Sequence, residues 1–178
     1  MDNDLFKNLL NSISVNELCE SKDEGSCRNY DKAKLDTSQM QPPVWAYVGD
    51  CVHNLYVRCH LVSKYHSNVN KLHKFSVSYV SAHSQSGTLH KIFDELSEHE
   101  QYIIKRGRNA KTGSVPKNAD ITEYKFATGF ESLIGYLFLE GKIERLTEIL
   151  KRSVDEAENL STNVSVNKKK DENSHEPI

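Results

Sequence analysis

One carboxylate, Glu131, lies inside a run that is otherwise largely apolar, FESLIGYLFL at residues 130–139. An ionised side chain is costly to remove from water unless another group compensates its charge. Glu131 therefore either points to solvent from a mostly buried helix or serves a chemical purpose. A second carboxylate, Asp50, follows Gly49 in the segment WAYVGDCVHNLYV, which is also rich in apolar residues. These two acids are the first candidates for a functional site.

Helical periodicity places both acids on surfaces that another helix could approach closely. At about 100° per residue, Glu131 shares one side of its helix with Ala127, Thr128 and Gly135, which are all small. Asp50 lies opposite the main apolar stripe of its own helix. If the two helices crossed there, repulsion between the carboxylates would be relieved by a shared proton or by a hard cation such as Mg²⁺. The spacing alone does not choose between these alternatives.

A cluster of basic residues is the second candidate feature. The net charge of −2 hides a division, because residues 1–41 and 151–178 are net acidic and residues 42–150 are net basic. Within the basic part, no acid interrupts the stretch from residue 105 to residue 117, whose cations are Lys105, Arg106, Arg108, Lys111 and Lys117. Such a stretch is either a solvated face or a surface for phosphate groups, with which arginine and lysine pair irrespective of sequence.

The elements that must position these residues are predicted to be helices, so the expected fold class is all-α. One helix starts after Pro42 and Pro43, and a second helical region covers residues 69–93, where Gly87 could introduce a break. No stretch shows the period-two alternation, flanked by turn residues, that is typical of strands. The apolar residues that recur at helical spacing are Val48, Val52, Leu55, Tyr56, Cys59, Val62, Leu72, Phe75, Tyr79, Val80, Ile143, Leu146, Ile149 and Leu150. Phe126, Phe130, Leu133, Ile134 and Leu137 form the expected core face of the helix that carries Glu131.

Polar residues and glycines set the expected ends of the remaining helices. The sequence SEHE fits a capping box, so a helix should start at Ser97 and end near Gly107. The following stretch GRNAKTGSVPKN, with two glycines and a proline, is predicted to be a loop that carries most of the basic cluster. Asp120 can cap the next helix, and Gly141 can stop it.

The length of 178 residues suits one domain with a substantial core. We expect residues 1–41 to form a polar, flexible extension, residues 42–156 the folded domain and residues 157–178 a disordered tail.

No apolar run approaches the roughly 18 residues of a membrane span, and the N-terminus lacks the basic start of a secretory signal. The protein is therefore expected in the cytoplasm and without a membrane partner.

The cysteines at positions 19, 27, 51 and 59 show no CxxC spacing and are expected to be reduced thiols. Other metal sites are alternatives to the two acids. One is a zinc site formed by Cys51, His53, Cys59 and His60. The other is the histidine pair His83 and His90, seven residues apart on a helix, which no acid completes.

Five segments between about residues 42 and 150 carry a family resemblance: WAYVGDCVHNLYVRCHL, LHKFSVSYVSAHSQ, IIKRGRNAK, PKNADITEYKFATGFESLIGYLFL and ERLTEIL. In this order they resemble the sequence blocks of Mini-ribonuclease III, the short branch of the ribonuclease III family, found in bacteria and plastids. The resemblance implies an all-helical homodimer that hydrolyses double-stranded RNA with Mg²⁺. The typical task of this branch is to trim the duplex stem that flanks large-subunit (23S) ribosomal RNA in its precursor. A plastid location would apply to a plant protein, although no transit peptide is evident.

Carried over by position, the resemblance makes Asp50 of VGD and Glu131 of FESLIG the catalytic, metal-binding acids. Longer family members use four acids in each site, but Ala46 and Thr128 occupy the two other positions here, as is general in the short branch. RNA phosphates and water would then complete the coordination of the metal. Thr128 could add a hydroxyl near the metal, or its hydroxyl could simply bond within its own helix.

The resemblance also bears on the substrate, and the sequence differs from the short branch at two further positions. His53 and Asn54 stand where the short branch often has tyrosine and glutamate. The 28 residues after Leu150 are too few and too polar for the separate RNA-binding domain of larger relatives. The thin set of acids leaves one alternative, a helical RNA-binding protein without cleavage activity, and a metal-dependent phosphohydrolase of small nucleotides is another. The residues expected to contact RNA are Lys74, Lys105, Arg106, Arg108, Asn109, Lys111 and Lys117.

Overall fold

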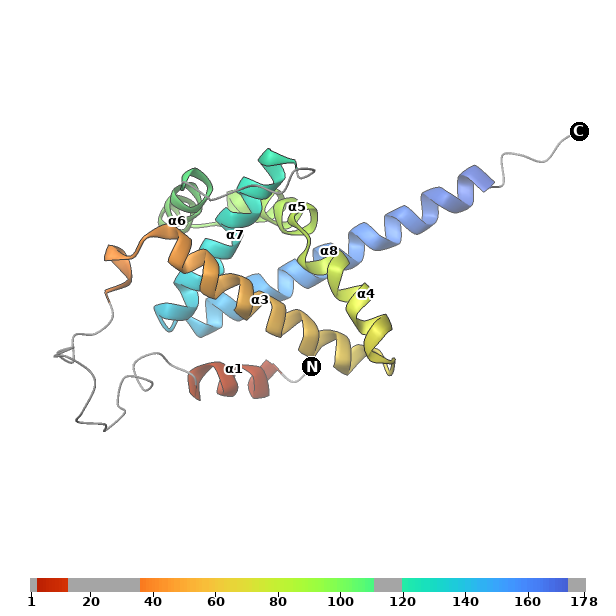
Figure 1. The fold of residues 1–178 in the computed structure, drawn as a ribbon, viewed down its shortest axis with the longest axis horizontal. Helices are drawn as coiled ribbons and strands as arrows, with labels where there is room; N and C mark the ends of the chain where they lie inside the picture. The colour runs from red at the N-terminus through yellow and green to blue at the C-terminus, as the bar shows by residue number, and fades with distance from the viewer. Residues whose placement is uncertain (1–2, 13–35, 111–119, 173–178) are drawn as a thin grey trace, which may run out of the picture.

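The computed structural model describes residues 3–12, 36–110 and 120–172 of the chain. These residues form α-helices and two short 3₁₀ helices, with no strand among them, and so confirm the all-α expectation (Figure 1). In chain order the elements are α1 (Asn3–Ser12), η1 (Thr37–Gln39), α3 (Pro42–Lys64), α4 (Val69–Val80), α5 (Ala82–Ile92), η2 (Phe93–Glu95), α6 (Glu98–Asn109), α7 (Ile121–Leu139) and α8 (Ile143–Glu172).

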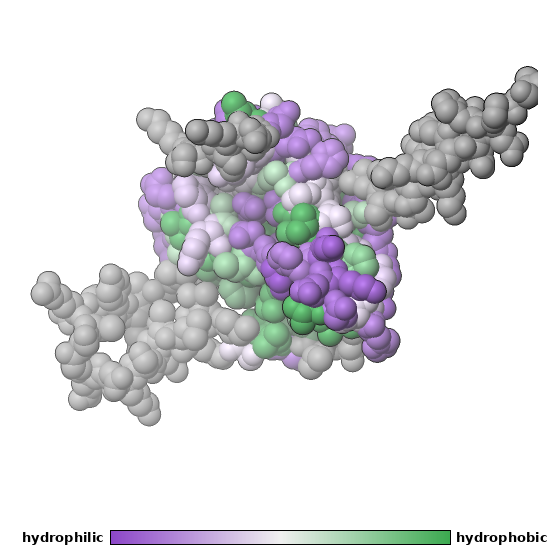
Figure 2. Space-filling view, turned by 45° about the vertical axis from the view of Figure 1, so that its right-hand side comes forward, coloured by the Kyte–Doolittle hydropathy of each residue, from purple (hydrophilic) through white to green (hydrophobic). Residues whose placement is uncertain are grey.

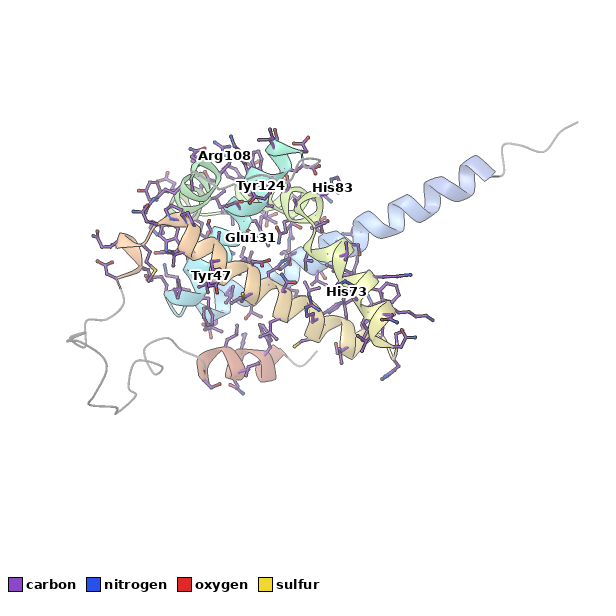
Figure 3. All side chains as sticks on the ribbon, viewed as in Figure 1. Tyr47, His73, His83, Arg108, Tyr124 and Glu131 are labelled. Atoms are coloured by element: carbon purple, nitrogen blue, oxygen red, sulfur yellow. The ribbon has the colours of Figure 1, made fainter. Side chains whose placement is uncertain are left out.

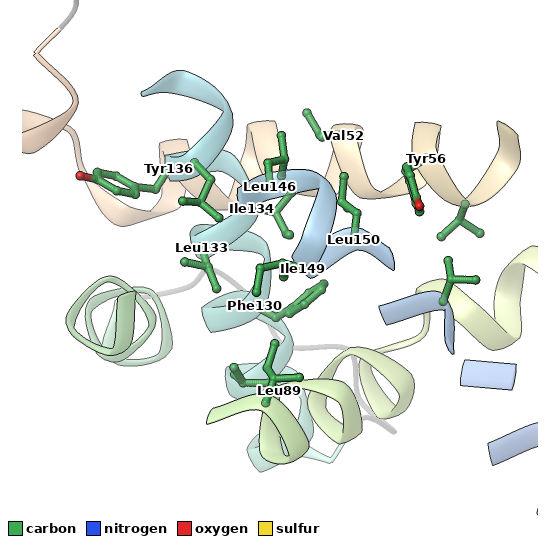
Figure 4. Close-up of a cluster of buried hydrophobic side chains, with 14 of the residues drawn as sticks. Val52, Tyr56, Leu89, Phe130, Leu133, Ile134, Tyr136, Leu146, Ile149 and Leu150 are labelled. Atoms are coloured by element: carbon green, nitrogen blue, oxygen red, sulfur yellow. The ribbon is translucent and has the colours of Figure 1, made fainter. Parts of the chain in front are cut away.

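Helix α7 lies inside the bundle and packs against α3, α5, α6 and α8 (Figure 1). A helix with neighbours on all sides must be apolar all round, which explains why the FESLIGYLFL run has so few polar residues. Phe130, Leu133 and Ile134 are fully buried within the main core, where side chains from α3, α5 and α8 meet them (Figure 4). Glu131 is the one carboxylate in this part of α7, and its position needs a separate explanation.

Three predicted helix boundaries are confirmed by their capping interactions. Ser97 Oγ accepts a hydrogen bond from Glu100 N, and Glu100 Oε2 accepts one from Ser97 N at 2.8 Å, which completes a capping box at the start of α6. Asp120 Oδ1 accepts from Thr122 N at 2.7 Å at the start of α7. At the end of α7, Gly141 has a positive φ of 69°, a conformation that glycine adopts without a steric penalty.

The break in the second helical region differs from the prediction. Gly87 lies inside α5, and the chain instead turns at Ser81, whose backbone is extended. Ser81 N donates to Val77 O at the end of α4, and Ser81 Oγ accepts from Ser84 N at the start of α5. A serine that caps both helices can therefore interrupt a helical pattern more effectively than an isolated glycine, which a helix tolerates.

The end of α6 also differs from the prediction, because the helix continues past Gly107 to Asn109. A Cβ atom on Gly107 would lie only 2.2 Å from Ser132 Oγ on α7. Gly107 is thus a packing residue within the helix rather than a helix breaker. As a consequence, Arg106 and Arg108 belong to the last turn of α6 and not to a loop.

The two ends of the chain contain more helix than expected. Within residues 1–41, α1 packs against α8, and the Phe6 ring meets the Tyr56 ring edge-on with centroids 4.9 Å apart. Both Phe6 and Leu10 are buried, so the short apolar patch near the N-terminus covers part of the core. Helix α8 extends to Glu172, past the expected start of the tail at residue 157. Whether these ends are required for folding stays a prediction.

Among the helices that the structure describes, none is both long enough and apolar enough to cross a membrane.

Candidate active site and basic surface

Two glycines bring the backbones of α3 and α7 into contact and thereby place the two acids. A Cβ atom on Gly49 would lie 1.8 Å from the backbone oxygen of Glu131, and one on Gly135 would lie 1.9 Å from that of Trp45. Asp50 directly follows Gly49 on α3, and Glu131 lies one turn before Gly135 on α7, at the crossing of the two helices (Figure 3). The close crossing that the small residues suggested is therefore present.

The two carboxylates have different surroundings. Asp50 is exposed, and Asn54 on the next turn of α3 donates a hydrogen bond from Nδ2 to Asp50 Oδ1 over 2.8 Å. Glu131 is only partly exposed. Its pKa is raised to about 7, first by burial and second by the negative charge of Asp50, while a hydrogen bond with the Gln85 side chain opposes the rise. The two acids are thus close enough to repel each other.

This pair of acids fits a hard divalent cation. Carboxylate oxygens are the ligands that Mg²⁺ prefers, and a cation would remove the repulsion that raises the pKa of Glu131. In the described part of the chain, no three His, Cys, Asp or Glu side chains come together as a metal site, and this includes the alternative set with Cys51, His53, Cys59 and His60. Asp50 and Glu131 would therefore be the protein ligands, and phosphates and water would supply the others.

Thr128 does not add a free hydroxyl to this site. Its Oγ1 donates a hydrogen bond to Tyr124 O at 3.0 Å, one turn earlier on α7. Ala46, at the position of the other missing acid, is buried in α3. Neither residue offers a third ligand to a metal held by Asp50 and Glu131.

A chain of buried polar groups continues from Glu131 through α5 and α3 to α8. Gln85 Nε2 lies 3.3 Å from His53 Nδ1, and His53 Nε2 lies 3.2 Å from Ser153 Oγ. Burial lowers the pKa of His53 to about 4, so this imidazole is neutral at physiological pH. Sequence reasoning assigned no role to Gln85 or Ser153. A signal for Gln85 exists, because it precedes Leu89 and Ile92 on the buried face of α5, where an apolar residue would be expected.

The basic cluster divides into cations that pack and cations that are exposed. Arg106 is half-buried, with its guanidinium carbon 4.7 Å from the centre of the Trp45 ring and 5.8 Å from that of Tyr102. It also donates a long hydrogen bond, 3.5 Å, from Nη2 to Met40 O. Stacking of this kind stabilises the fold, so Arg106 has a structural role that its place in a basic run did not reveal.

Arg108 is half-buried like Arg106, whereas Lys105 and Lys74 are more accessible to a ligand. The guanidinium carbon of Arg108 lies 5.3 Å from the centre of the Phe126 ring, and Arg108 Nε donates to Asn109 Oδ1 over 3.4 Å. Lys105 is exposed on the same turn of α6. Lys74 is exposed on α4, and its neighbour His73 lies well apart from Arg108 in Figure 3. The remaining two expected contacts lie outside the described residues: Lys111 and Lys117.

An exposed carboxylate and a partly buried one at a helix crossing, beside a basic helix end, define a candidate nuclease site in an all-helical domain. Residues 44–142 match the family model of the Ribonuclease III domain, which spans more than half of the chain. The chain is 46% identical over 115 residues to Mini-ribonuclease 3 of Thermoanaerobacter sp. (strain X514), covering 65% of this chain and 81% of that protein. It is 44% identical over 135 residues to Mini-ribonuclease 3 of Clostridium tetani, covering 75% and 89%.

A solved structure gives the same result for the fold. The crystal structure of a Fusobacterium nucleatum protein superposes with a TM-score of 0.60 at 30% identity, covering 66% of this chain and 93% of that one. The chain belongs to the ribonuclease III family and, within it, to the Mini-ribonuclease 3 group. The expected ribonuclease III-type fold and the expected enzyme class, an endoribonuclease specific for double-stranded RNA, are thereby confirmed.

Proposed function

We propose that Asp50 and Glu131 hold Mg²⁺ and that the enzyme uses this ion to hydrolyse phosphodiester bonds of double-stranded RNA. The observation that carries the proposal is the glycine-mediated crossing of α3 and α7, which places the two acids within interaction distance. Two like charges at a partly buried position are unfavourable unless a cation or a proton accompanies them. The family match supports the cation.

The protein residues have distinct tasks in this mechanism. Mg²⁺, when bound, would activate water for in-line attack on phosphorus and offset negative charge on the leaving 3′ oxygen. Asp50 and Glu131 bind the ion in their ionised forms. Asn54 orients Asp50 through its 2.8 Å hydrogen bond. Backbone contact at Gly49 keeps the distance between the two helices fixed, which keeps both acids in place.

The exposed cations at the end of α6 are the proposed contacts to the RNA backbone. A regular duplex presents two rows of phosphates, which lysine and arginine recognise irrespective of sequence. Arg108 and Asn109 lie in the last turn of α6, and the exposed Lys105 lies just before that turn. Helix α6 packs against α7, which carries Glu131. Lys74 on α4, together with Lys111 and Lys117, remains part of the same proposal. Because Arg106 packs on Trp45, we assign it a smaller share of the binding energy.

A homodimer is the proposed assembly. One face of α3 presents apolar or uncharged side chains to solvent at helical spacing, including Val44, Tyr47, Cys51 and Leu55. Tyr47 is 76% exposed, and it lies one turn before Asp50. Apolar groups also lie among hydrophilic ones on the face drawn in Figure 2. A second copy packed on α3 would cover this stripe, and a twofold arrangement would place one active site on each RNA strand.

The proposed substrate is the duplex stem of a large-subunit ribosomal RNA precursor, and the proposed location is the cytoplasm. The resemblance of the chain to Mini-ribonuclease 3 supports both proposals.

One experiment tests these proposals together. A labelled long RNA duplex is incubated with the full-length chain in Mg²⁺, in Ca²⁺ or in EDTA, while sedimentation reports the mass. We expect cleavage only with Mg²⁺, binding without efficient cleavage in Ca²⁺, and a mass of about twice 20.3 kDa. Binding with no cleavage in all three conditions, Mg²⁺ included, would favour the RNA-binding alternative. Competition by mononucleotides would favour a small-molecule phosphohydrolase.

A further inference from the structure

A buried amide, Gln85, lies between Glu131 and the polar chain that ends on α8. Gln85 is 2% exposed, and a buried amide is costly unless its donor and acceptor groups are hydrogen-bonded. Its side chain hydrogen-bonds with Glu131 on one side, and its Nε2 lies 3.3 Å from His53 Nδ1 on the other. Leu89, one turn further along α5, shows that this face accepts apolar residues. An amide at this position therefore indicates a polar purpose.

The hydrogen bonds of this chain have a fixed direction. Ser153 Oγ donates its only hydrogen to Leu150 O at 2.7 Å, so towards His53 it can only accept. His53 Nε2, 3.2 Å away, must then carry the proton of the imidazole. The neutral ring leaves Nδ1 as an acceptor, and it accepts from Gln85 Nε2. The ionised Glu131 carboxylate can also only accept, so it too requires the N–H side of the Gln85 amide.

We propose that Gln85 is a positioning residue for Glu131 and that His53, held by Ser153, fixes the orientation of the Gln85 amide. The proposal rests on the proposed function, because it gives Glu131 the role of a metal-binding acid. It makes the two acids equivalent in one respect, since each accepts a hydrogen bond from a side-chain amide: Asp50 from Asn54 and Glu131 from Gln85. An acid that is already oriented loses less freedom when it binds an ion.

Replacement of Gln85 by methionine is the direct test, because methionine has a similar length and no N–H group. Mn²⁺ binding to the RNA-free protein, measured by calorimetry, should become about 10- to 100-fold weaker. The kcat for duplex cleavage should fall by a similar factor, and the KM should stay within about twofold, because the RNA contacts are unchanged. Ser84→Ala is the matched control, since its buried hydroxyl on the same helix has no hydrogen-bond partner in the described structure.

A second variant tests the part played by His53 and remains informative if Gln85→Met does not fold. Phenylalanine at position 53 preserves the edge-on contact with Phe130, whose ring centroid is 5.2 Å away, but cannot accept from Gln85. His53→Phe should weaken Mn²⁺ binding by less than Gln85→Met, because the amide is still present but no longer oriented. The double variant should bind Mn²⁺ no more weakly than Gln85→Met alone, since both changes act through one hydrogen-bond chain.

The outcomes separate this proposal from the function on which it rests. A wild-type protein that binds no Mn²⁺ and cleaves no duplex would overturn both. Wild-type Mn²⁺ affinity and kcat in both Gln85→Met and His53→Phe, with an intact wild-type activity, would overturn only the positioning role. Additive losses in the double variant would show that His53 acts independently of Gln85 and would overturn its part in the proposal.

Discussion

The acid site and the basic end of α6 both depend on glycines that contact α7, but the positions of their charged groups are fixed by different kinds of contact. At the acid site, Gly49 brings α3 against the backbone of Glu131, so that no side chain separates the two helices. At the basic end, Gly107 brings α6 against Ser132, and the arginines on either side of it, Arg106 and Arg108, extend over aromatic rings rather than over backbone. The acids are fixed by main chain, whereas the cations are fixed by side chains.

The difference fits the two kinds of chemistry that we propose for these regions. A metal requires its ligands at defined positions, and an error of about 1 Å costs much of the activity. Attraction between cations and phosphates acts over a Debye length of about 8–10 Å in physiological salt, so a lysine can shift and still contribute. Changes at the crossing of α3 and α7 should therefore abolish activity, and changes at the end of α6 should weaken binding by degrees.

The largest expected effect comes from removal of either acid. Asp50→Asn and Glu131→Gln should each lower kcat by about 1000-fold or more, because a bound metal contributes several kcal/mol to catalysis. Duplex affinity measured in Ca²⁺ and the unfolding temperature should remain close to wild type, because both changes preserve side-chain shape and remove one of two repelling charges. Near wild-type turnover in either variant would show that the metal site lies elsewhere.

The second prediction concerns the crossing itself. Gly49→Ala should lower the free energy of unfolding by about 3 kcal/mol or more, because overpacked residues force neighbouring groups apart. The added Cβ atom would lie 1.8 Å from the backbone oxygen of Glu131, so the acid must move and cleavage should be lost with the stability. Urea unfolding and a cleavage assay at low temperature would measure both.

Gly141→Ala provides the comparison for that variant. Nothing lies within 4 Å of a Cβ atom there, and only the positive φ of 69° opposes the substitution. The expected loss of stability is about 1 kcal/mol, with unchanged cleavage. Equal losses for the two glycine variants would contradict the assignment of Gly49 to a steric role.

Much of this architecture could be predicted from sequence because local signals determined it. Ser97 and Asp120 cap helices through contacts to residues two or three positions away, and such contacts are visible in the sequence. Asp50 and Glu131 were found because an acid is unusual among small and apolar neighbours. The helix ends could thus be predicted because their capping residues match the local sequence pattern. The acid pair could be predicted because a charged side chain is unexpected among apolar neighbours.

Other features depended on contacts between residues far apart in the chain. The stacking of Arg106 on Trp45 and the link from His53 to Ser153 have no local signature. The contact of Phe6 with Tyr56 likewise depends on the packing of α1 against α8, which only the folded bundle provides. The sequence of a basic run or of a short apolar patch does not indicate which of its side chains will contact residues far away in the chain.

The third prediction tests the buried support of the acid site through its pH dependence. His53 is 1% exposed, and burial lowers its pKa from 6.5 to about 4, so the folded state favours the neutral ring. The stability associated with this neutral ring is complete above pH 6.5 and is lost as the pH falls towards 4. The difference in pKa corresponds to about 3 kcal/mol.

Urea unfolding between pH 7.5 and pH 4.5 would measure this contribution in the wild type and in His53→Phe. The free energy of unfolding should decrease more steeply with falling pH in the wild type, because only in the wild type does unfolding expose an imidazole that then takes up a proton at its ordinary pKa. Parallel pH profiles for the two proteins would show that His53 does not remain neutral in the folded state.

The smallest effects are expected at the end of α6, where stability and RNA binding should separate between neighbouring cations. Arg106→Ala should lower the free energy of unfolding by about 1 kcal/mol, because the guanidinium 4.7 Å from the Trp45 ring is lost. Lys105→Ala, at an exposed position, should change stability by less than about 0.5 kcal/mol. If Lys105 neutralises one phosphate, its removal should reduce the slope of log affinity against log salt by roughly one unit or somewhat less. Arg108, which contacts Phe126 but remains partly exposed, should show an intermediate share of both effects.

Thermal unfolding together with duplex binding at several salt concentrations would measure the two quantities in each variant. A full salt slope in Lys105→Ala, or an unchanged stability in Arg106→Ala, would mean that packing and binding are not divided between these residues in this way.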